Sequence, residues 1–452
     1  MNEAVNKILK KYKAIIGLEV HAELKTESKM FCGCKNDPFN AVEPNIYTCP
    51  VCLGLPGALP VANKKAIEWT IKLGLALNCK INLNSKFDRK HYYYPDLPKG
   101  YQISQYDLPF CYEGTVPTST GNIELTRIHL EEDTAKLIHK TIDGKIVSLI
   151  DFNRSSVPLI ELVSEPVITS AAQAKEYTKY IRQVIRFLDI GDCHMQAGGM
   201  RLEANVSLIK RSDKSNNLPC YKVEIKNINS FKFLEAAINS EIVRQSEILD
   251  NGKIPRQETR GWDAVKNKSF SQRFKEEAED YRYFPEPDLP PIRFTQKQIE
   301  AIAKELPELA SQKEKRWHKD YQIDLRYAKI LSSEKKTSEL FDNLWQECRA
   351  LDINPNDLAK KLVNKRIEWS ETSCVKNIIG AYRSNSQTDD FSEEELKKII
   401  KQVLKNNPDA VAKYKQGKKQ VLGFLIGQIM KSVEKKLDHK AVQRMLLEEL
   451  DG

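Results

Sequence analysis

Strict alternation of apolar and polar residues marks several segments in the first half of the chain. Segments 16–24, 200–208 and 221–226 each carry an apolar residue at every second position. A period of two is typical of a β-strand with one buried face and one polar face. The polar faces of the first two segments carry Glu19, His21, Glu23, Arg201, Glu203, Asn205 and Ser207. A Lys/Ser/Asn-rich loop joins the last two segments, which predicts a hairpin within an antiparallel sheet.

Two further stretches, 129–133 and 159–165, concentrate acidic side chains. Glu161 stands within an apolar run, where an unpaired carboxylate would cost considerable free energy. A divalent ion compensates several such carboxylates at once, and carboxylate oxygens suit Mg²⁺. His21 is a less usual magnesium ligand, which leaves open Mn²⁺ or a role outside the coordination shell. The alternative for any single strand is a polar face that is merely solvated.

Proline-rich and polar stretches divide the chain. The segment 286–292 contains three prolines and predicts a boundary, and 383–390 is a polar stretch that predicts a second linker. Helical patterns follow the first boundary, with capping-box signatures at Thr295 with Gln298 and at Ser392 with Glu395. We therefore expect an α+β protein with three parts. They are an antiparallel-sheet domain over 1–292, an all-α helical domain over 293–388 and a small helical tail over 389–452.

Four of the ten cysteines fall within 21 residues, in the pattern Cys-x-Cys followed by Cys-x-x-Cys. Thiols stay reduced in the cytosol, where such pairs usually indicate metal or redox chemistry. Two close pairs of thiolates suit a tetrahedral zinc ion that stabilises the fold. The alternative is four incidental thiols. The predicted zinc ligands are Cys32, Cys34, Cys49 and Cys52.

Composition sets outer limits on the class of protein. The chain has 452 residues, of which 41% are hydrophobic, so a wholly disordered polymer is excluded. No apolar run of membrane-spanning length and no signal-peptide pattern is present, which predicts a cytoplasmic protein without a membrane segment. There are 71 Lys and Arg against 62 Asp and Glu, a net charge of +9. Residues 401–452 hold eleven basic against six acidic side chains, so the tail carries most of this excess. A nucleic-acid partner is permitted but not required.

The chain lacks a Walker A motif and a strand-linked Gly-x-Gly-x-x-Gly motif, so any nucleotide site is of another type. Seven stretches in sequence order closely resemble the GatB family, the B subunits of tRNA-dependent amidotransferases. They are residues 17–24, 49–57, 91–102, 129–133, 159–166, 280–288 and 417–431. The related archaeal E-type subunit carries a large inserted domain for which this chain has no room. The resemblance therefore favours the B type.

The resemblance implies a cradle domain, a helical domain and a tail similar to the YqeY proteins. It also implies a heterotrimer with an amidase-like A subunit, which releases ammonia from glutamine, and a small C subunit. The B subunit would use ATP to phosphorylate the side-chain carboxylate of misacylated Glu-tRNA(Gln), Asp-tRNA(Asn) or both. Ammonia would then displace the phosphate. Phosphorylation supplies the leaving group that a carboxylate lacks, and this transfer depends chiefly on positioning and charge neutralisation.

The same resemblance implies roles for individual residues. The Mg²⁺ ligands would be Glu19, His21, Glu131, Glu132 and Glu161. The catalytic set would be Glu19, His21, Glu131, Glu161 and Glu203. Arg201 would neutralise phosphate of the ATP cofactor, with an ordinary ion pair in the sheet as the alternative. Tyr92, Tyr93 and Lys99 would contact tRNA by stacking and charge, or belong to a packed aromatic turn. Lys418, Lys419 and Lys431 would contact tRNA phosphates, or lie on a solvated helical face.

Two other functions remain open from the sequence. A non-catalytic scaffold would bind tRNA without tRNA-dependent ATP turnover. A stand-alone ATP-dependent carboxylate–amine ligase would act on a small molecule without tRNA, and it would leave the basic tail unexplained.

Overall fold

The structure is a computed structural model that describes residues 2–213, 218–274, 281–386, 393–418, 420–432 and 439–451. The chain divides into two compact units, Met1–Lys313 and Glu314–Gly452. Part of the predicted linker over 383–390, together with Ser392 and Lys419, lies outside the described residues. Each unit is described by itself.

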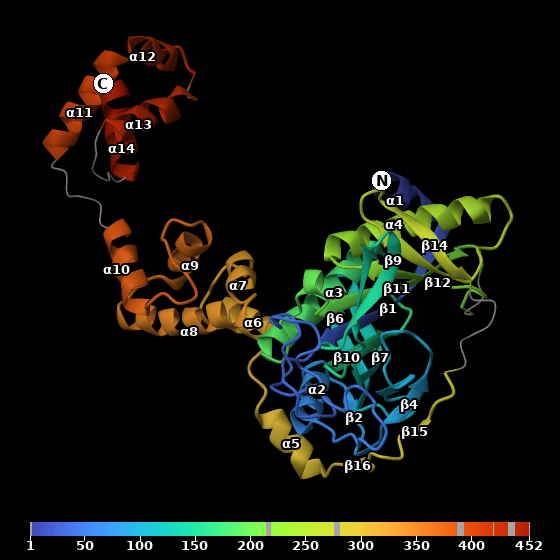
Figure 1. The fold of residues 1–452 in the computed structure, drawn as a ribbon. Coiled ribbons are helices and arrows are strands. Elements are labelled where there is room, and N and C mark those ends of the chain that lie inside the picture. The colour runs from blue at the N-terminus through green and yellow to red at the C-terminus, as the bar shows by residue number, and fades with distance from the viewer. Residues whose placement is uncertain are drawn as a thin grey trace. The chain divides into compact units, whose positions relative to one another are not determined.

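A nine-stranded sheet forms the centre of the first unit (Figure 1). Its strands run in the order β14-β13-β12-β11-β1-β10-β7-β6-β2. In chain order they are β1 (Tyr12–Glu23), β2 (Lys80–Ile81), β6 (Cys111–Thr118), β7 (Gly121–Glu132), β10 (Pro158–Ser164), β11 (Met200–Lys210), β12 (Val223–Ile228), β13 (Glu258–Asp263) and β14 (Lys268–Phe274). All neighbouring strands are antiparallel except β12 and β13, which are parallel. The predicted antiparallel sheet and the predicted hairpin of β11 with β12 are confirmed.

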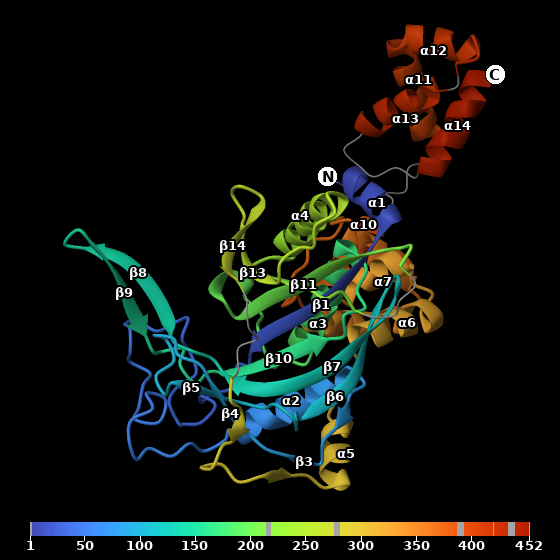
Figure 2. The same cartoon turned by 90° about the vertical axis from the view of Figure 1, so that its right-hand side faces the viewer.

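Three smaller sheets accompany this large sheet. One has the order β15 (Phe284–Pro285), β4 (Asp88–His91), β5 (Tyr101–Ser104), and a second pairs β16 (Ile292–Arg293) with β3 (Asn84–Ser85). The third is a hairpin of β8 (Lys136–Ile142) and β9 (Lys145–Asp151), which projects from the body of the unit (Figure 2).

Helices cover the apolar face of the large sheet. The helices of this unit are α1 (Asn2–Lys11), α2 (Lys64–Ala76), α3 (Ala171–Phe187), α4 (Phe231–Asp250) and α5 (Gln296–Lys304), with a short 3₁₀ turn η1 (Met195–Ala197). Ser170 and Ser230 cap the backbone at the starts of α3 and α4. Apolar side chains of α2, α3 and α4 join those of β1 in one core, so Leu18 and Val20 are buried. Because side chains alternate along a strand, Glu19 and His21 lie on the opposite, polar face of the sheet.

The first unit continues beyond residue 292. The predicted capping box of Thr295 with Gln298 is confirmed at the start of α5. Ile299 and Leu309 then contribute to the core of the first unit, which explains why this unit ends at Lys313. The three-part division at 292 and 388 stays a prediction.

The second unit is helical. Its helices are α6 (Ala310–Asp320, which begins in the first unit), α7 (Leu325–Leu331), α8 (Lys335–Ala350), α9 (Pro355–Val363), α10 (Val375–Ser386), α11 (Glu393–Asn406), α12 (Pro408–Lys415), α13 (Val421–Lys431) and α14 (His439–Asp451). One core gathers around Trp317 and Phe341, and another around Ile400 and Leu446. Together with the sheet unit this is the predicted α+β class. Among the described helices, none combines the length and apolar character needed to cross a bilayer.

Candidate active site and thiolate site

Strand register aligns a row of polar side chains across the sheet. His21 of β1 is paired with Glu161 of β10, and Glu161 is paired with His129 of β7. The Nε2 atom of His21 lies 3.2 Å from Oε2 of Glu161, and Nε2 of His129 lies 3.3 Å from the same oxygen. One carboxylate is therefore held between two imidazoles from the strands on either side of it.

Glu131 completes this cluster from β7. Its Oε2 lies 3.6 Å from Nε2 of His129, and its Oε1 lies 4.0 Å from Nε2 of His21. The hydroxyl of Ser104 in β5 donates a hydrogen bond of 3.0 Å to Glu131. Glu131, His129 and Glu161 are all buried, so the protein has moved two carboxylates out of bulk water beside two imidazoles.

Mutual attraction shifts the pKa values in this cluster. Burial by itself lowers the pKa of His21, but the charge and hydrogen bond of Glu161 outweigh it and raise the pKa to about 9. Burial by itself raises the pKa of Glu161, yet His129 and His21 hold that pKa well below its usual range. Burial likewise opposes ionisation of Glu131, whereas the hydrogen bond with His129 and the charge of Lys90 lower its pKa. The two carboxylates are thus held ionised at neutral pH.

The cluster fits a divalent ion. One ligand atom from each of His21, Glu131 and Glu161 can be chosen so that all three lie within 4.8 Å of one another. Within the described part of the chain, the buried Nδ1 atoms of His21 and His129 have no hydrogen-bond partner. A site of carboxylate oxygens with one imidazole is compatible with Mg²⁺ or Mn²⁺.

Glu19 and Glu203 belong to a neighbouring group. They face each other across the pairing of β1 with β11, and together with Glu224 of β12 their oxygens lie within 4.8 Å. Burial and then the charge of Glu161 raise the pKa of Glu19. Lys226 is paired with Glu203 at 3.1 Å and with Glu224 at 3.5 Å. The five predicted catalytic residues therefore divide between two adjacent groups on one face of the sheet.

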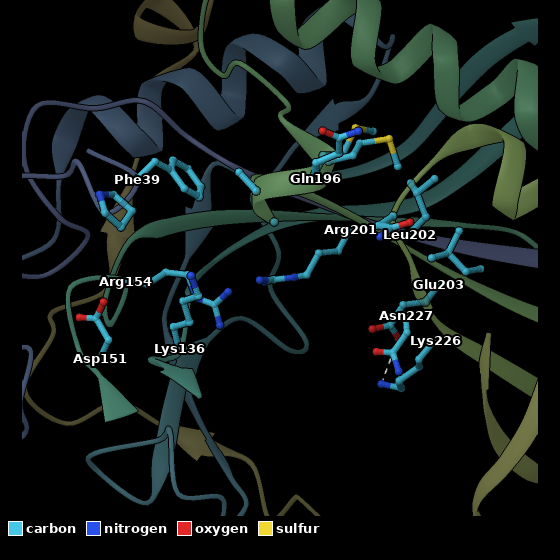
Figure 3. Close-up of a pocket in the computed structure, with 17 residues that line it drawn as sticks. Phe39, Lys136, Asp151, Arg154, Gln196, Arg201, Leu202, Glu203, Lys226 and Asn227 are labelled. Atoms are coloured by element: carbon cyan, nitrogen blue, oxygen red, sulfur yellow. Dashed lines mark ion pairs between the residues drawn. The ribbon is translucent and has the colours of Figure 1, made fainter. Parts of the chain in front are cut away.

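A pocket of about 640 Å³ opens beside these groups. Figure 3 shows Lys136 and Arg154 on one side, Glu203 and Lys226 on the other, and the side chain of Arg201 between them. Since Arg201 is paired with His21 in the sheet, the pocket lies one strand from the imidazole–carboxylate cluster. Four cationic side chains around one cavity are suited to an anionic ligand.

Arg201 also takes part in an ion pair. Its Nη1 lies 2.8 Å from Oδ2 of Asp133, and Nε of Arg154 lies 3.8 Å from the same oxygen. Burial opposes ionisation of Asp133, but Arg201 and then Arg154 hold its pKa far below the usual range. Burial and the neighbouring Asp133 raise the pKa of Glu23 well above its usual range. Arg201 therefore forms the ion pair that was the alternative to a phosphate-binding role, and the same side chain also lines the pocket.

Glu132 does not belong to the cluster of His21, Glu131 and Glu161. It is adjacent to Glu131 in β7 and therefore points the other way, where one Oε accepts a hydrogen bond of 3.0 Å from the backbone N–H of Ile103. It also forms an ion pair with Lys99 at 2.5 Å, and both side chains are largely buried. Of the other two residues predicted to contact tRNA here, Tyr93 is exposed, whereas burial raises the pKa of the partly buried Tyr92.

The tail residues are placed only in part. Lys418 and Lys431 are exposed, Lys431 at the end of α13, and Lys419 lies outside the described residues. Their contact with tRNA stays a prediction.

The four predicted zinc ligands converge. The sulfur atoms of Cys32, Cys34, Cys49 and Cys52 all lie within 4.8 Å of one another, and those of Cys49 and Cys52 are 3.8 Å apart. A tetrahedral zinc with sulfur at about 2.3 Å has sulfur–sulfur separations of about 3.8 Å, so the geometry fits this ion. A hydrogen bond with Cys32 lowers the pKa of Cys52 to about 5. Burial opposes this shift, and the positive charge of Lys29 adds to it.

Three residues near the site were not singled out from the sequence. His129 and Asp133 occupy every second position with Glu131, so the period-two rule applied to 129–133 places all three on one face. That rule also separates Glu132 from them. Lys90 of β4 is half-buried, and the charges of Glu131 and Glu161 act on it, a proximity that no local pattern of the sequence predicts.

Comparison with known proteins agrees with this fold and site. Residues 14–300 match the family model of the GatB/GatE catalytic domain. Residues 326–450 match a second family model, the GatB domain, which is named after GatB and YqeY. The first match covers most of the sheet unit, including both groups of carboxylates. The sheet unit is therefore a catalytic domain of the GatB/GatE class.

Curated relatives are similar over nearly the whole chain. The B subunit of aspartyl/glutamyl-tRNA(Asn/Gln) amidotransferase from Thermoanaerobacter sp. (strain X514) is 42% identical over 97% of this chain and 99% of its own length. The protein of the same name from Thermodesulfovibrio yellowstonii is 42% identical over 96% and 98%, and that from Clostridium novyi 40% over 97% and 99%. The chain belongs to the GatB family of amidotransferase subunits.

Proposed function

We propose that the chain is the ATP-dependent subunit of an aminoacyl-tRNA amidotransferase. It would phosphorylate the side-chain carboxylate of Glu-tRNA(Gln), Asp-tRNA(Asn) or both, and convert the product to the amide. The observation that carries this proposal is the adjacency of the His21, Glu131 and Glu161 cluster to a cationic pocket across one strand pairing. A phosphoryl transfer needs an anion site beside a divalent-ion site.

The reaction has two balanced steps. A side-chain carboxylate oxygen of the aminoacyl-tRNA attacks the γ-phosphorus of ATP, the bond to the β–γ bridging oxygen breaks, and ADP leaves with the electron pair. Ammonia then attacks the acyl carbon, one proton is released, and phosphate leaves to give the amide. The first step supplies the leaving group that the second step needs.

The protein's own groups would orient the anions and neutralise their charge. Arg201 and Arg154 extend into the pocket and would hold phosphate oxygens through fork-shaped hydrogen bonds. Asp133 lies against both guanidinium groups and fixes their positions. His21, Glu131 and Glu161 would hold a Mg²⁺ ion, which would supply positive charge to offset that of the phosphate. Glu203 lines the pocket and Glu19 lies close to it in the same carboxylate group, where the two would orient a second part of the substrate.

The partners follow from the same proposal. As membership of the GatB family implies, ammonia would come from an amidase-like A subunit, with a small C subunit completing a heterotrimer. Exposed Lys418 and Lys431 would contact tRNA phosphates. We place the reaction in the cytoplasm, where the thiols of the predicted zinc site stay reduced.

Reconstitution of the trimer tests this function. With ATP, Mg²⁺ and glutamine, the complex should amidate misacylated tRNA and release ADP only when that tRNA is present. Comparing Glu-tRNA(Gln) with Asp-tRNA(Asn) identifies the substrate. Binding of tRNA without ADP release would favour a scaffold, and amidation of free amino acids without tRNA would favour a stand-alone ligase.

A further inference from the structure

Lys29 is a completely buried lysine beside the four cysteines. Its ammonium donates hydrogen bonds to the carbonyl oxygens of Tyr47 at 2.6 Å and Phe152 at 3.2 Å, and it approaches Sγ of Cys52 at 3.9 Å. These three contacts use all three N–H groups of the ammonium. Among the described residues no carboxylate forms an ion pair with it. A buried charge without a counter-charge is costly, and the thiolates are the negative groups at hand.

The two carbonyls that Lys29 joins come from distant parts of the chain. Tyr47 belongs to the loop between the two cysteine pairs, residues 35–48, which we name the cysteine loop, and Phe152 follows the end of β9. Lys29 therefore lies where the cysteine loop meets the segment 151–155, and it bonds to both sides. Its backbone N–H also donates to the carbonyl of Cys34 at 3.0 Å, which ties it to the first cysteine pair.

Side-chain hydrogen bonds reinforce the same junction. Asn153 is buried, accepts from the N–H of Tyr47 at 2.8 Å and donates to the carbonyl of Glu43 at 2.8 Å. Asn45 accepts from the N–H of Phe152 at 2.7 Å. The hydroxyl of the buried Ser155 donates to the carbonyl of Cys52 at 2.9 Å. The cysteine loop and the segment 151–155 therefore form one hydrogen-bonded body.

This body supplies one wall of the pocket. Asp151 and Arg154, from the segment 151–155, line the cavity, and so do Pro38 and Phe39, from the cysteine loop. Arg154 is also fixed by donating to the carbonyls of Thr134 and Ala135, each at 2.9 Å. The cysteine site is thus connected to the pocket through its own loop and through Lys29.

We propose that Lys29 is a positioning residue that couples metal binding at the four cysteines to the shape of the anion pocket. Four thiolates around Zn²⁺ leave an excess of negative charge, which the ammonium of Lys29 offsets while its other N–H groups hold the segment 151–155 in place. Loss of the metal then releases Phe39 and Arg154 together. The link to ATP rests on the proposed function, whereas the link between metal and pocket wall does not.

The substitution Lys29→Met tests this coupling, with Lys64→Met as the matched control because Lys64 is 89% exposed on α2. Each full-length protein is loaded with zinc, and zinc release to a chromogenic chelator is timed. Losing a partner of metal ligands typically weakens metal affinity about 10- to 100-fold, so Lys29→Met should release zinc faster by about that factor, and Lys64→Met should match the wild type. Zinc content and release unchanged in Lys29→Met would overturn the proposal.

Hydrogen exchange supplies a readout that is independent of activity and of the variant's folding. In the wild-type chain, zinc removal should speed exchange in peptides covering 38–48 and 151–155, while peptides of α4 stay protected. Equal exchange at 151–155 with and without zinc would overturn the coupling even if zinc binds. Weaker ATP binding by Lys29→Met, with these exchange changes, extends the coupling to the ligand. Unchanged ATP binding alongside faster exchange would count against ATP as the pocket's ligand and leave the coupling standing.

Discussion

Oε2 of Glu161 lies 3.2 Å from Nε2 of His21 and comes from the neighbouring strand at the paired register position. Burying such an ion pair costs desolvation free energy, and the attraction between the two charges offsets this cost only when their geometry is good. Here His129 provides a second imidazole at 3.3 Å. A buried carboxylate between two imidazoles, with shifted pKa values, is typical of a site that binds and polarises a ligand.

Glu161→Gln should abolish most of the activity of the reconstituted complex. The near-isosteric change removes a charge that His21 and His129 face, and with it a metal ligand, so we expect a loss of at least about 100-fold in tRNA-dependent ADP release. Glu124→Gln is the control, because Glu124 is exposed on the neighbouring strand β7. Near wild-type rates for Glu161→Gln at saturating Mg²⁺ would contradict the assigned site.

Arg201→Lys keeps the positive charge but removes the planar fork that faces Asp133 and the pocket. A charge-assisted hydrogen bond is worth about 1.5–3 kcal/mol, so the KM for ATP should rise about 10- to 100-fold. The exposed Arg326 of α7 provides the control Arg326→Lys. A change confined to thermal stability, with KM for ATP unaltered, would assign Arg201 to a structural ion pair alone.

Cys49→Ser should lower the zinc content of the purified chain well below one ion per molecule. Losing the metal opens the loop between the cysteine pairs, and closing a loop of about 15 residues contributes about 3 kcal/mol in cross-linked proteins. Elemental analysis and thermal unfolding measure the two effects. Cys374→Ser, at an exposed thiol outside the cluster, should change neither. Wild-type protein that is purified without zinc or another thiophilic metal would refute the site.

Acid should weaken helix α7 through Asp324. The carboxylate accepts from the side chain and the backbone N–H of Arg326, and these bonds lower the pKa of Asp324 to about 2. Since the folded pKa lies below the unfolded value of about 3.9, the stabilisation is present above pH 4 and is lost as pH falls towards 2. Hydrogen exchange over 325–331 should therefore speed up in that window. Asp324→Asn keeps a capping side chain and should flatten this dependence; an unaltered pH profile would contradict it.

The tail lysines should bind tRNA with a strong dependence on salt. Replacing Lys418 and Lys431 together by Ala should reduce the slope of log affinity against log salt by about one for each phosphate that is no longer neutralised. Filter binding at several salt concentrations measures the slope. Lys329→Ala, on α7, is the control. A weaker affinity with the slope unchanged would indicate that the variant disturbs folding rather than phosphate binding.

Local patterns predicted much of the sheet and of the site. The alternation in 16–24 and 200–208 identified β1 and β11, because a strand with one buried face must repeat every two residues. The spacing of the four cysteines identified a cluster that the structure confirms as a convergence of sulfur atoms. Grouping Glu132 with Glu131 ignored the same period, and the structure puts Glu132 beside Lys99 instead.

The sequence by itself determined the strands, their polar faces, the thiolate cluster and, through motifs in order, the family. Only the tertiary structure decided which polar faces meet. Strand register, which depends on the pairing of β1 with both β10 and β11, brings Glu161 to His21 and Glu203 to Glu19. The tertiary structure likewise brings the ammonium of Lys29 to the carbonyl of Phe152, more than a hundred residues away in the sequence. Period and spacing are properties of a local segment, whereas pairing and burial depend on the whole chain, so no local pattern contains them.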